Sequence, residues 1–404
     1  MSLRVLRPLL TVLVFVPLIF AQTTPFTLTG PATLGPAPNS TFNFTGSGAV
    51  TMTPGGPAQL KMDVFDTGDD ICNRNIEAAV TITIANGDRL DLTLFIPLSE
   101  GEKVSGTFVI TGGTGQYAGK GGSGTGTIAI STPAPNLDHF DLTVTLTGTI
   151  TAQPIVTPSI NPSGVVPLGH SRVMIQPGSW ISIYGKNLAS GTTIWDGLSS
   201  DIPTTLGGLT ATINGKPAFF WFTSPGQVNL QAPDDSLRGC ATVTLSTPNG
   251  PVSAQVQINQ AAPSLSLLDA KYPAAVILTP NGGGAYGGGT YDLAGPANRF
   301  TYATRPVKKG ENLVLYGVGF GPTNPAVPAG KVFSGSARVQ QGFPVQVLIN
   351  NNLVNAAYVG LIGAGLYQIN ITVPANLPVG DNALQVITPG AGGQTQDNIF
   401  LSVQ

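Results

Sequence analysis

The feature of this sequence that most constrains its fold is a duplication in the second half of the chain. Residues 178–185 (GSWISIYG) line up with residues 310–317 (GENLVLYG), and residues 227–233 (QVNLQAP) line up with residues 368–374 (QINITVP). The period is longer than that of stacked solenoid repeats, so the sequence predicts two copies of a whole domain. Shorter matches keep the same order at nearly constant spacing: Ile213-Asn214 with Ile349-Asn350, Gly239 with Gly380, and Thr247-Pro248 with Thr388-Pro389.

Each copy has the length, the short alternating strands and the turn signals of an immunoglobulin-like β-sandwich. We expect the copies to superpose, with Tyr184 on Tyr316 and Asn229 on Asn370. Residues kept in two copies with different surroundings are more often structural than functional. The tyrosines should therefore bury ring area, and the asparagines should satisfy backbone groups at a strand edge or bulge.

Residues 22–153 are predicted to form a separate all-β domain. Apolar and polar residues alternate with a period of two, for example over residues 60–64, 80–84 and 90–94. This is the pattern of strands with one buried face. Asn86-Gly87, between two of these runs, is a strong hairpin signal because a tight turn needs positive φ at both positions. Such strands build a barrel or a sandwich, and the sequence leaves both open.

Two segments fall outside these patterns. Residues 154–167 contain four prolines, which cannot donate to a strand ladder, so we expect a linker there. Residues 168–262 and 263–404 then hold the two sandwich domains. The second copy carries a stretch without counterpart in the first, and the glycine-rich insertion within it at residues 281–290 predicts a flexible loop set between short strands. The predicted fold class is all-β throughout.

The N-terminus has the three-part plan of a secretory signal peptide, predicted at residues 1–21. Arg4 and Arg7 precede an apolar run, and Ala21 offers a small residue at the cleavage site. The run is interrupted by Pro17 and is shorter than the roughly 20 residues that span a bilayer. We therefore expect a secreted protein, extracellular or periplasmic, with no transmembrane segment once the signal is removed.

Charge and cysteine content narrow the possible partners. Only 9% of residues are charged, against about 25% in ordinary domains. The formal net charge is −2, and no basic patch that would hold a phosphate backbone is visible, so nucleic acid is not an expected partner. Cys72 and Cys240 are far apart in sequence and fall in different predicted domains, so we expect two unpaired thiols rather than a disulfide.

Several of these motifs resemble known families. Residues 316–328 (YGVGFGPTNPAVP) and 365–374 (GLYQINITVP) resemble an uncharacterised C-terminal domain family of Solibacter-type acidobacterial exported proteins, over residues 156–404. The opening of each copy is similar to IPT/TIG immunoglobulin-like domains. The resemblance implies a pair of β-sandwiches on an exported protein, with no established activity or site residues. Residues 106–119 resemble a strand-turn element of allene oxide cyclase and dirigent-type barrels.

No catalytic or cofactor-binding constellation is visible in the sequence. There is no Gly-x-Ser-x-Gly elbow, and neither His139 nor His170 is paired with a nucleophile or with a second metal ligand at a recognisable spacing. The glycines at 112–115 precede a strand pattern rather than the helix that a phosphate cradle needs. We therefore assign no catalytic residue, no cofactor and no metal.

Two weaker candidates remain. Asp66, Asp69 and Asp70 form an acidic cluster in a glycine-containing loop that could bind Ca²⁺, although no known calcium-loop spacing is present and a charged turn is the alternative. The aromatic run of Phe219, Phe220, Trp221 and Phe222 cannot enter one core from one strand, because successive side chains point to opposite faces. One side must pack against a neighbouring domain or form a platform for sugar rings or a partner.

The hypothesis favoured by these patterns is an exported, non-catalytic β-domain protein that binds, spaces or assembles at a cell surface. One alternative is a carbohydrate-binding accessory protein that uses the aromatic run, with polysaccharide as its partner in place of an envelope protein. Another is a secreted enzyme centred in the N-terminal domain. A closed barrel with a polar-lined cavity would favour the enzyme, and a filled core would favour the binding module.

Overall fold

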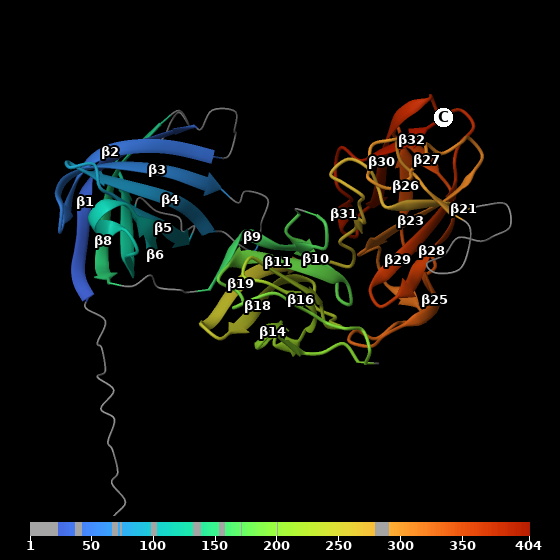
Figure 1. The fold of residues 1–404 in the computed structure, drawn as a ribbon, viewed down its shortest axis with the longest axis horizontal. Coiled ribbons are helices and arrows are strands. Elements are labelled where there is room, and N and C mark those ends of the chain that lie inside the picture. Colours follow the sequence, from blue (N-terminus) through green and yellow to red (C-terminus); the bar gives the residue numbers. More distant parts are fainter. Residues whose placement is uncertain are drawn as a thin grey trace, which may run out of the picture. The chain divides into compact units, whose positions relative to one another are not determined.

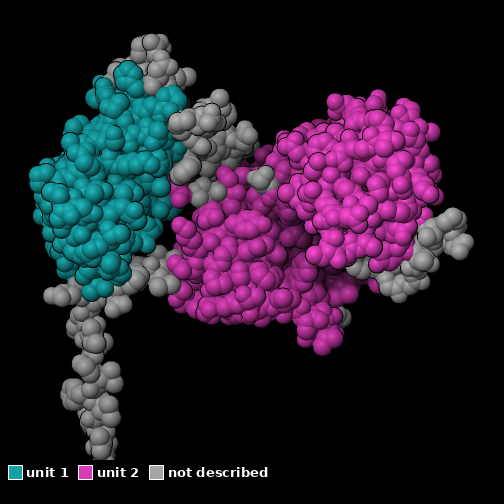
Figure 2. Space-filling view, turned by 45° about the horizontal axis from the view of Figure 1, so that its top comes forward, with its two compact units in different colours: residues 1–64, 78–155 teal, residues 65–77, 156–404 magenta. Residues whose placement is uncertain are grey.

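A computed structural model describes residues 23–36, 43–66, 72, 75–97, 103–131, 139–152, 158–170, 172–199, 201–278 and 291–404. The chain forms two compact units, one made of Met1–Val64 with Ala78–Ile155 and the other of Phe65–Glu77 with Val156–Gln404 (Figure 2). Apart from a 3-10 helix at Gly115–Tyr117, the regular secondary structure of the described residues is all strand, which confirms the all-β prediction (Figure 1). No helix among them is long and apolar enough to cross a membrane. The predicted signal peptide and the glycine-rich insertion lie outside the described residues.

The first unit is a closed eight-stranded barrel in which the strands follow one another in chain order and the first pairs with the last. This decides between the barrel and the sandwich that the sequence left open. Alternation along each strand sends one set of side chains inward and the other outward. The strands are β1 (Thr23–Pro36), β2 (Asn43–Thr53), β3 (Gly56–Asp66), β4 (Asn75–Ile84), β5 (Arg89–Pro97), β6 (Lys103–Gly113), β7 (Gly121–Ile130) and β8 (Phe140–Thr151).

The barrel interior is filled by apolar side chains packed against glycines. Phe26 and Phe108 are fully buried and meet edge to face, with ring centroids 5.6 Å apart. A Cβ atom added at Gly124 or Gly148 would lie 2.7 or 2.8 Å from the Phe108 ring, so these glycines make room for that ring. The inward positions that the structure describes are apolar, as in a packed core.

The second unit contains the two predicted sandwiches. In the first, the sheet β12-β16-β17-β11-β9 packs on the sheet β10-β19-β18-β14-β13, with β15 added beside β14, and both sheets contribute to one apolar core. The strands are β9 (Ser159–Pro167), β10 (Met174–Ile175), β11 (Trp180–Lys186), β12 (Thr193–Ile194), β13 (Thr205–Leu206), β14 (Leu209–Ile213), β15 (Lys216–Pro217), β16 (Phe219–Thr223), β17 (Gln227–Gln231), β18 (Gly239–Thr247) and β19 (Gly250–Ile258).

The second sandwich repeats this arrangement with additions. Its sheets are β22-β21-β23-β29-β28-β25-β24, with β20 beside β23, and β27-β26-β30-β31, with β32 beside β30; together they enclose a second core. The strands are β20 (Ser264–Leu265), β21 (Ala275–Leu278), β22 (Tyr291–Leu293), β23 (Asn312–Val318), β24 (Thr323–Asn324), β25 (Ser334–Val339), β26 (Gln346–Ile349), β27 (Asn352–Val354), β28 (Ala356–Gly363), β29 (Leu366–Thr372), β30 (Gly380–Thr388), β31 (Gly393–Gln394) and β32 (Phe400–Val403).

The two copies share their central strand order and their register. β11 lies between β17 and β9, and its counterpart β23 lies between β29 and the strands β20 and β21. Tyr184 is opposite Gln227 in the first copy, and Tyr316 is opposite Gln368 in the second. The hairpin turns also match, since Asn214 and Asn350 have φ of 52° and 50°. The duplication read from the sequence is therefore confirmed in strand order and pairing.

The predicted linker is wrong over much of its length. Ser159–Pro167 forms β9, which pairs with β11 on one side only and so lies at the edge of its sheet. An edge strand tolerates proline, because the missing N–H has no ladder partner to satisfy. The register shifts between Ile183 and Gly185 on the partner strand, opposite a part of β9 in which Ser163 has a φ of 53°.

The expectation of two unpaired thiols is also wrong. Cys72 and Cys240 form a disulfide across a sequence separation of 168 residues. Cys72 lies between barrel strands β3 and β4, but its segment Phe65–Glu77 clusters with the second unit. Both cysteines thus belong to the same compact unit, although the neighbours of Cys72 in the sequence form the barrel.

Candidate binding surface around the tryptophans

The aromatic run lies on β16, and a β-bulge breaks its alternation. The register with β17 shifts between Phe220 and Phe222, which leaves Trp221 as the extra residue. Phe220 and Thr223 both point into the core and are fully buried, whereas Trp221 is 42% exposed. A bulge re-aims a side chain in this way. The prediction that at least one aromatic of the run is partly exposed is confirmed.

All three tryptophans of the chain gather at this place. The ring centroids of Trp221 and Trp180 are 5.6 Å apart, with the planes inclined at 59°. Trp195, just after β12, donates its backbone N–H to the carbonyl oxygen of Trp221 at 2.9 Å. Trp180 is buried and Trp195 is half-buried in the same apolar cluster, so the exposed indole of Trp221 rests on a fixed base.

The base of this cluster is anchored in both sandwiches. The indole Nε1 of Trp180 donates to the carbonyl oxygen of Ala364 at 2.6 Å, between β28 and β29 of the second copy. A Cβ atom at Gly330 would lie 2.2 Å from the ring of Phe219, so Phe219 packs directly on that backbone. Val318 of the second copy completes the cluster. Phe219 thus packs against the neighbouring domain, which was one of the two hypotheses for the aromatic run.

Buried amide side chains hold the same junction rigid. Gln231 donates from Nε2 to the carbonyl oxygen of Gly178 at 2.8 Å and accepts the N–H of Gly330 at Oε1 at 2.9 Å. Gln176 accepts the N–H of Gly321 at 2.7 Å. Tyr367 donates its hydroxyl to the carbonyl of Gly321, and burial raises the pKa of that hydroxyl. Backbone groups that would be unpaired at the junction are therefore satisfied.

Polar groups and exposed apolar side chains surround the tryptophans. Trp195 Nε1 donates to Ser199 Oγ at 3.3 Å, and the carboxylate of Asp196 accepts the N–H of Leu198 at 3.0 Å. Asp201 forms an ion pair with Lys331 of the second copy. Leu198 is 87% exposed. The surface thus combines the partly exposed Trp221 with hydroxyl, carboxylate and ammonium groups in the segment from Trp195 to Asp201 and at Lys331. We call Trp180, Trp195, Trp221, Asp196, Ser199 and Asp201 the tryptophan surface.

The other candidates give no site among the described residues. Asp66 ends β3, but its side chain, Asp69 and Asp70 lie outside the described residues, so the calcium hypothesis is not tested. Among the described residues no group of three His, Cys, Asp or Glu side chains could hold a metal ion. His139 is exposed. His170 accepts the N–H of Arg172 at Nδ1 at 3.0 Å and faces the carbonyl oxygen of Gln394 with Nε2 at 3.3 Å.

Burial lowers the pKa of His170. Both ring nitrogens face backbone groups, which suits a neutral, structural imidazole at the junction of the sandwiches.

The repeated asparagines have side-chain partners rather than the backbone partners that we expected. Gln227 Nε2 donates to Asn229 Oδ1 at 2.8 Å, and Gln368 Nε2 donates to Asn370 Oδ1 at 2.7 Å. Each pair lies two residues apart on one strand face, so the same bond recurs in both copies. Both tyrosines were predicted to bury ring area. Tyr316 is buried and Tyr184 is half-buried.

Sequence reasoning missed Trp180 and Trp195. A signal was available in the duplication itself. Trp180 occupies the position that Asn312 holds in the second copy, and all three tryptophans belong to the first copy. Residues that differ between two copies of one fold mark where the copies have diverged in role.

No family model and no curated protein matches this chain. Among solved structures it is similar to the surface glycan-binding protein SGBP-B of the Bacteroides ovatus mixed-linkage glucan utilization locus, solved with a mixed-linkage heptasaccharide. The identity is 12% and the TM-score 0.29, over 82% of this chain and 64% of that one. The plexin A4 extracellular region matches at 10% identity and a TM-score of 0.20, over 95% of this chain and 28% of that one. The chain spans less than two thirds of either.

Proposed function

We propose that this chain is an exported, non-catalytic binding protein and that the tryptophan surface is its saccharide-binding face. The observation that carries the proposal is the exposed indole of Trp221 on a base fixed by Trp180 and the second sandwich. Sugar rings present C–H groups on one face and hydroxyls around the edge. An aromatic plane with polar neighbours complements both.

Rigidity supports binding at this place. A side chain that is already held in its bound geometry loses little conformational freedom when a ligand arrives. Trp221 is fixed by a bulge, by ring contact with Trp180 and by the backbone bond from Trp195. Asp196 and Ser199 lie in the turn after Trp195, where Ser199 accepts from the indole of Trp195 and Asp196 accepts from the N–H of Leu198.

The non-catalytic part of the proposal is supported by the filled barrel and by His170. The inward side chains described for the barrel are apolar, which favours the module over an enzyme centred there. His170 faces backbone groups at both nitrogens, so it is not available as a base. Export is supported by the signal-peptide pattern of residues 1–21. The disulfide, which persists in oxidising compartments, also supports export.

The test is binding of the mature chain to soluble neutral polysaccharides, namely hydroxyethylcellulose, galactomannan and xylan, by affinity electrophoresis and calorimetry. Trp221→Ala should weaken binding of the recognised polymer at least about tenfold, or ~1.4 kcal/mol. Tyr291→Ala removes another exposed aromatic away from this surface and should leave binding unchanged. Equal affinity of the wild type and Trp221→Ala, with the fold intact, would remove the tryptophan surface from consideration.

A further inference from the structure

The part of the second sandwich without counterpart in the first carries a second exposed aromatic group. β21 lies beside β23 as β9 lies beside β11, but the sheet of the first sandwich ends at β9. In the second sandwich β22 is added beyond β21, at the edge of the sheet. Residues 295–304, which follow β22, hold the rings discussed below.

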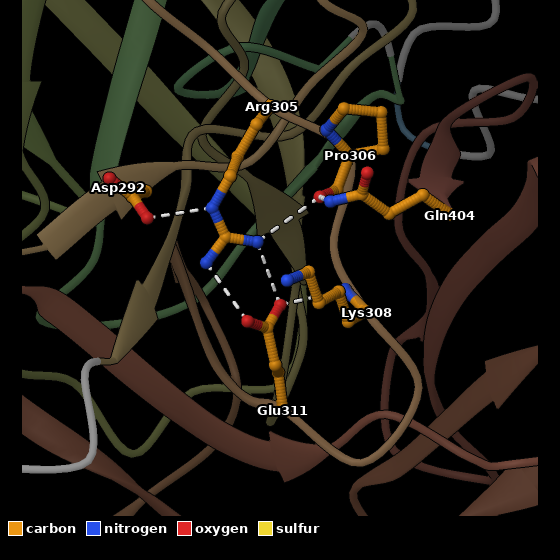
Figure 3. Close-up of polar contacts among 6 residues, drawn as sticks. All are labelled: Asp292, Arg305, Pro306, Lys308, Glu311 and Gln404. Atoms are coloured by element: carbon orange, nitrogen blue, oxygen red, sulfur yellow. Dashed lines mark hydrogen bonds and ion pairs between the residues drawn. The ribbon is translucent and has the colours of Figure 1, made fainter.

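Both ends of residues 295–304 are fixed by one arginine (Figure 3). Arg305 donates from Nε to Asp292 at 2.6 Å, and from its two terminal nitrogens to the two carboxylate oxygens of Glu311 at 2.9 Å each. A bidentate arginine–carboxylate pair of this kind is strong and directional. Gln404, the last residue, donates to the carbonyl of Pro306 at 2.9 Å. The segment is therefore held to β22, to the start of β23 and to the chain's C-terminus.

Three rings on and beside this segment contact one another in a row, from a buried ring to an exposed one. Phe300 and Tyr302 are stacked, with centroids 5.3 Å apart and planes inclined at only 8°. Phe300 meets Tyr272 edge to face at 6.4 Å, and Tyr272 is buried. Tyr302 is 44% exposed. Tyr302 therefore reaches solvent while its ring stacks on Phe300.

Charged groups adjoin the rings in balanced pairs. The guanidinium of Arg299 lies 4.9 Å from the centroid of Tyr272 and donates from Nε to Asp269 at 2.7 Å. Lys271 pairs with Asp381 at 2.7 Å, and Tyr272 donates its hydroxyl to the same carboxylate at 2.9 Å. Desolvation raises the pKa of Asp269, but bonds from backbone N–H groups and Arg299 outweigh it and the net shift is downward. Donors and acceptors thus stand side by side with no net charge.

We propose that the stacked Phe300–Tyr302 pair, with Arg299 and Asp269, is a second saccharide-binding platform that takes a neutral sugar ring. The exposed part of the Tyr302 ring stacks on the C–H face of the sugar ring. The guanidinium uses two of its five donors on Asp269, so it retains donors for sugar hydroxyls, while the carboxylate accepts from them. An anionic ligand is disfavoured, because it would meet Asp269 and Asp381 and would have to compete for their partners.

This platform does not depend on the tryptophan surface, since it lies on a different sandwich and uses different residues. It gives a role to the stretch that the duplication leaves unexplained. A polymer that reaches both sites would be bound more tightly than a short oligosaccharide that fills one.

The experiment compares Tyr302→Ala, Tyr302→Phe and Trp221→Ala against the polysaccharides named above, by calorimetry on the full mature chain. Tyr302→Ala should weaken binding by about tenfold, and Tyr302→Phe should keep most of it because the ring remains. Tyr291→Ala, again an exposed tyrosine of the same sandwich, should bind like the wild type. Near-ultraviolet circular dichroism and thermal unfolding establish that each variant is folded.

The outcomes separate the two sites. Loss of affinity in both Tyr302→Ala and Trp221→Ala supports two platforms. Loss in Trp221→Ala alone overturns the second platform and leaves the first. Binding only to a uronate-containing polymer such as pectin, or capture of an envelope protein in place of any polysaccharide, overturns the assignment of a neutral sugar. A folded wild-type chain that binds no polysaccharide overturns both.

Discussion

Trp180 and Trp221 lie in ring contact, with centroids 5.6 Å apart, although one is buried and the other is 42% exposed. The only side-chain donor of Trp180, its indole N–H, bonds to Ala364 of the other sandwich, so its ring is held in place. Trp221 therefore has a fixed neighbour on one side and solvent on the other. In the proposed site Trp180 therefore serves stability and Trp221 serves binding, so mutation can separate the two roles.

Alanine substitutions along β16 should give unequal losses of stability. Phe220→Ala removes a fully buried ring and should lower the free energy of unfolding by about 3–5 kcal/mol. Trp221→Ala should cost clearly less, because much of its ring already contacts water. Urea unfolding of both variants measures the difference. Large and equal losses for all four aromatics would show that the run is purely structural.

The amide of Gln231 should matter more than its size suggests. Gln231→Ala leaves the N–H of Gly330 without its partner, and an unsatisfied buried donor costs about 1–3 kcal/mol. Gln340→Ala, at an exposed position, is the matched control and should stay within about 0.5 kcal/mol of the wild type. Chemical denaturation gives the energies, and hydrogen exchange of the Gly330 amide should accelerate only in Gln231→Ala. Unchanged exchange there would contradict the role of the amide.

The disulfide should stabilise the chain through the loop that it closes. Cys72 and Cys240 are 168 positions apart in the sequence, and for a loop of this size loop-closure entropy predicts up to roughly 5 kcal/mol. Thiol reductant, or the double variant Cys72→Ser with Cys240→Ser, should lower the denaturation midpoint. Mass spectrometry of the non-reduced chain checks the bond itself. An equal denaturation midpoint with and without reductant would show that the bond does not stabilise the chain.

The sequence predicted most of the architecture because its signals are local or repeated. Alternation predicted the barrel strands, and the duplicated motifs predicted the pairing of β11 with β17 and of β23 with β29. These motifs lie on the paired strands themselves. β9 was missed because proline is a poor guide at a sheet edge, where a missing N–H has no consequence.

The site was only half visible in the sequence. The aromatic run on β16 was found, but strict alternation placed Phe219 and Trp221 on one face and gave no hint of the bulge at Trp221. The role of Trp180 depends on Ala364, which is 184 residues away. The disulfide depends on a segment that leaves its sequence neighbours for the other unit. Such contacts are set by tertiary packing, which single-sequence patterns do not contain.

The final prediction concerns pH and the network around Arg305. Desolvation raises the pKa of Glu311, but the bonds from Arg305 and from the N–H of Lys308 outweigh it, and the net pKa is lowered. A carboxylate with a depressed folded-state pKa contributes stability above its unfolded pKa, about 4.3. That contribution is lost as pH falls through the folded-state value. The wild type should therefore melt at a higher temperature than Glu311→Gln at pH 7. The gap should narrow from about pH 4.3 downward.

Thermal unfolding of both proteins between pH 7 and pH 3 tests this. Asp397→Asn removes an exposed carboxylate that accepts from Gln385 and Gln394 rather than from Arg305, and it controls for the change in net charge. If the difference in melting temperature between the wild type and Glu311→Gln stays constant from pH 7 to pH 3, the charge of the Glu311 carboxylate is not what holds Arg305. Arg305 would then be held by Glu311 through neutral hydrogen bonds and packing, and the ion pair with Asp292 would be its charge-dependent contact.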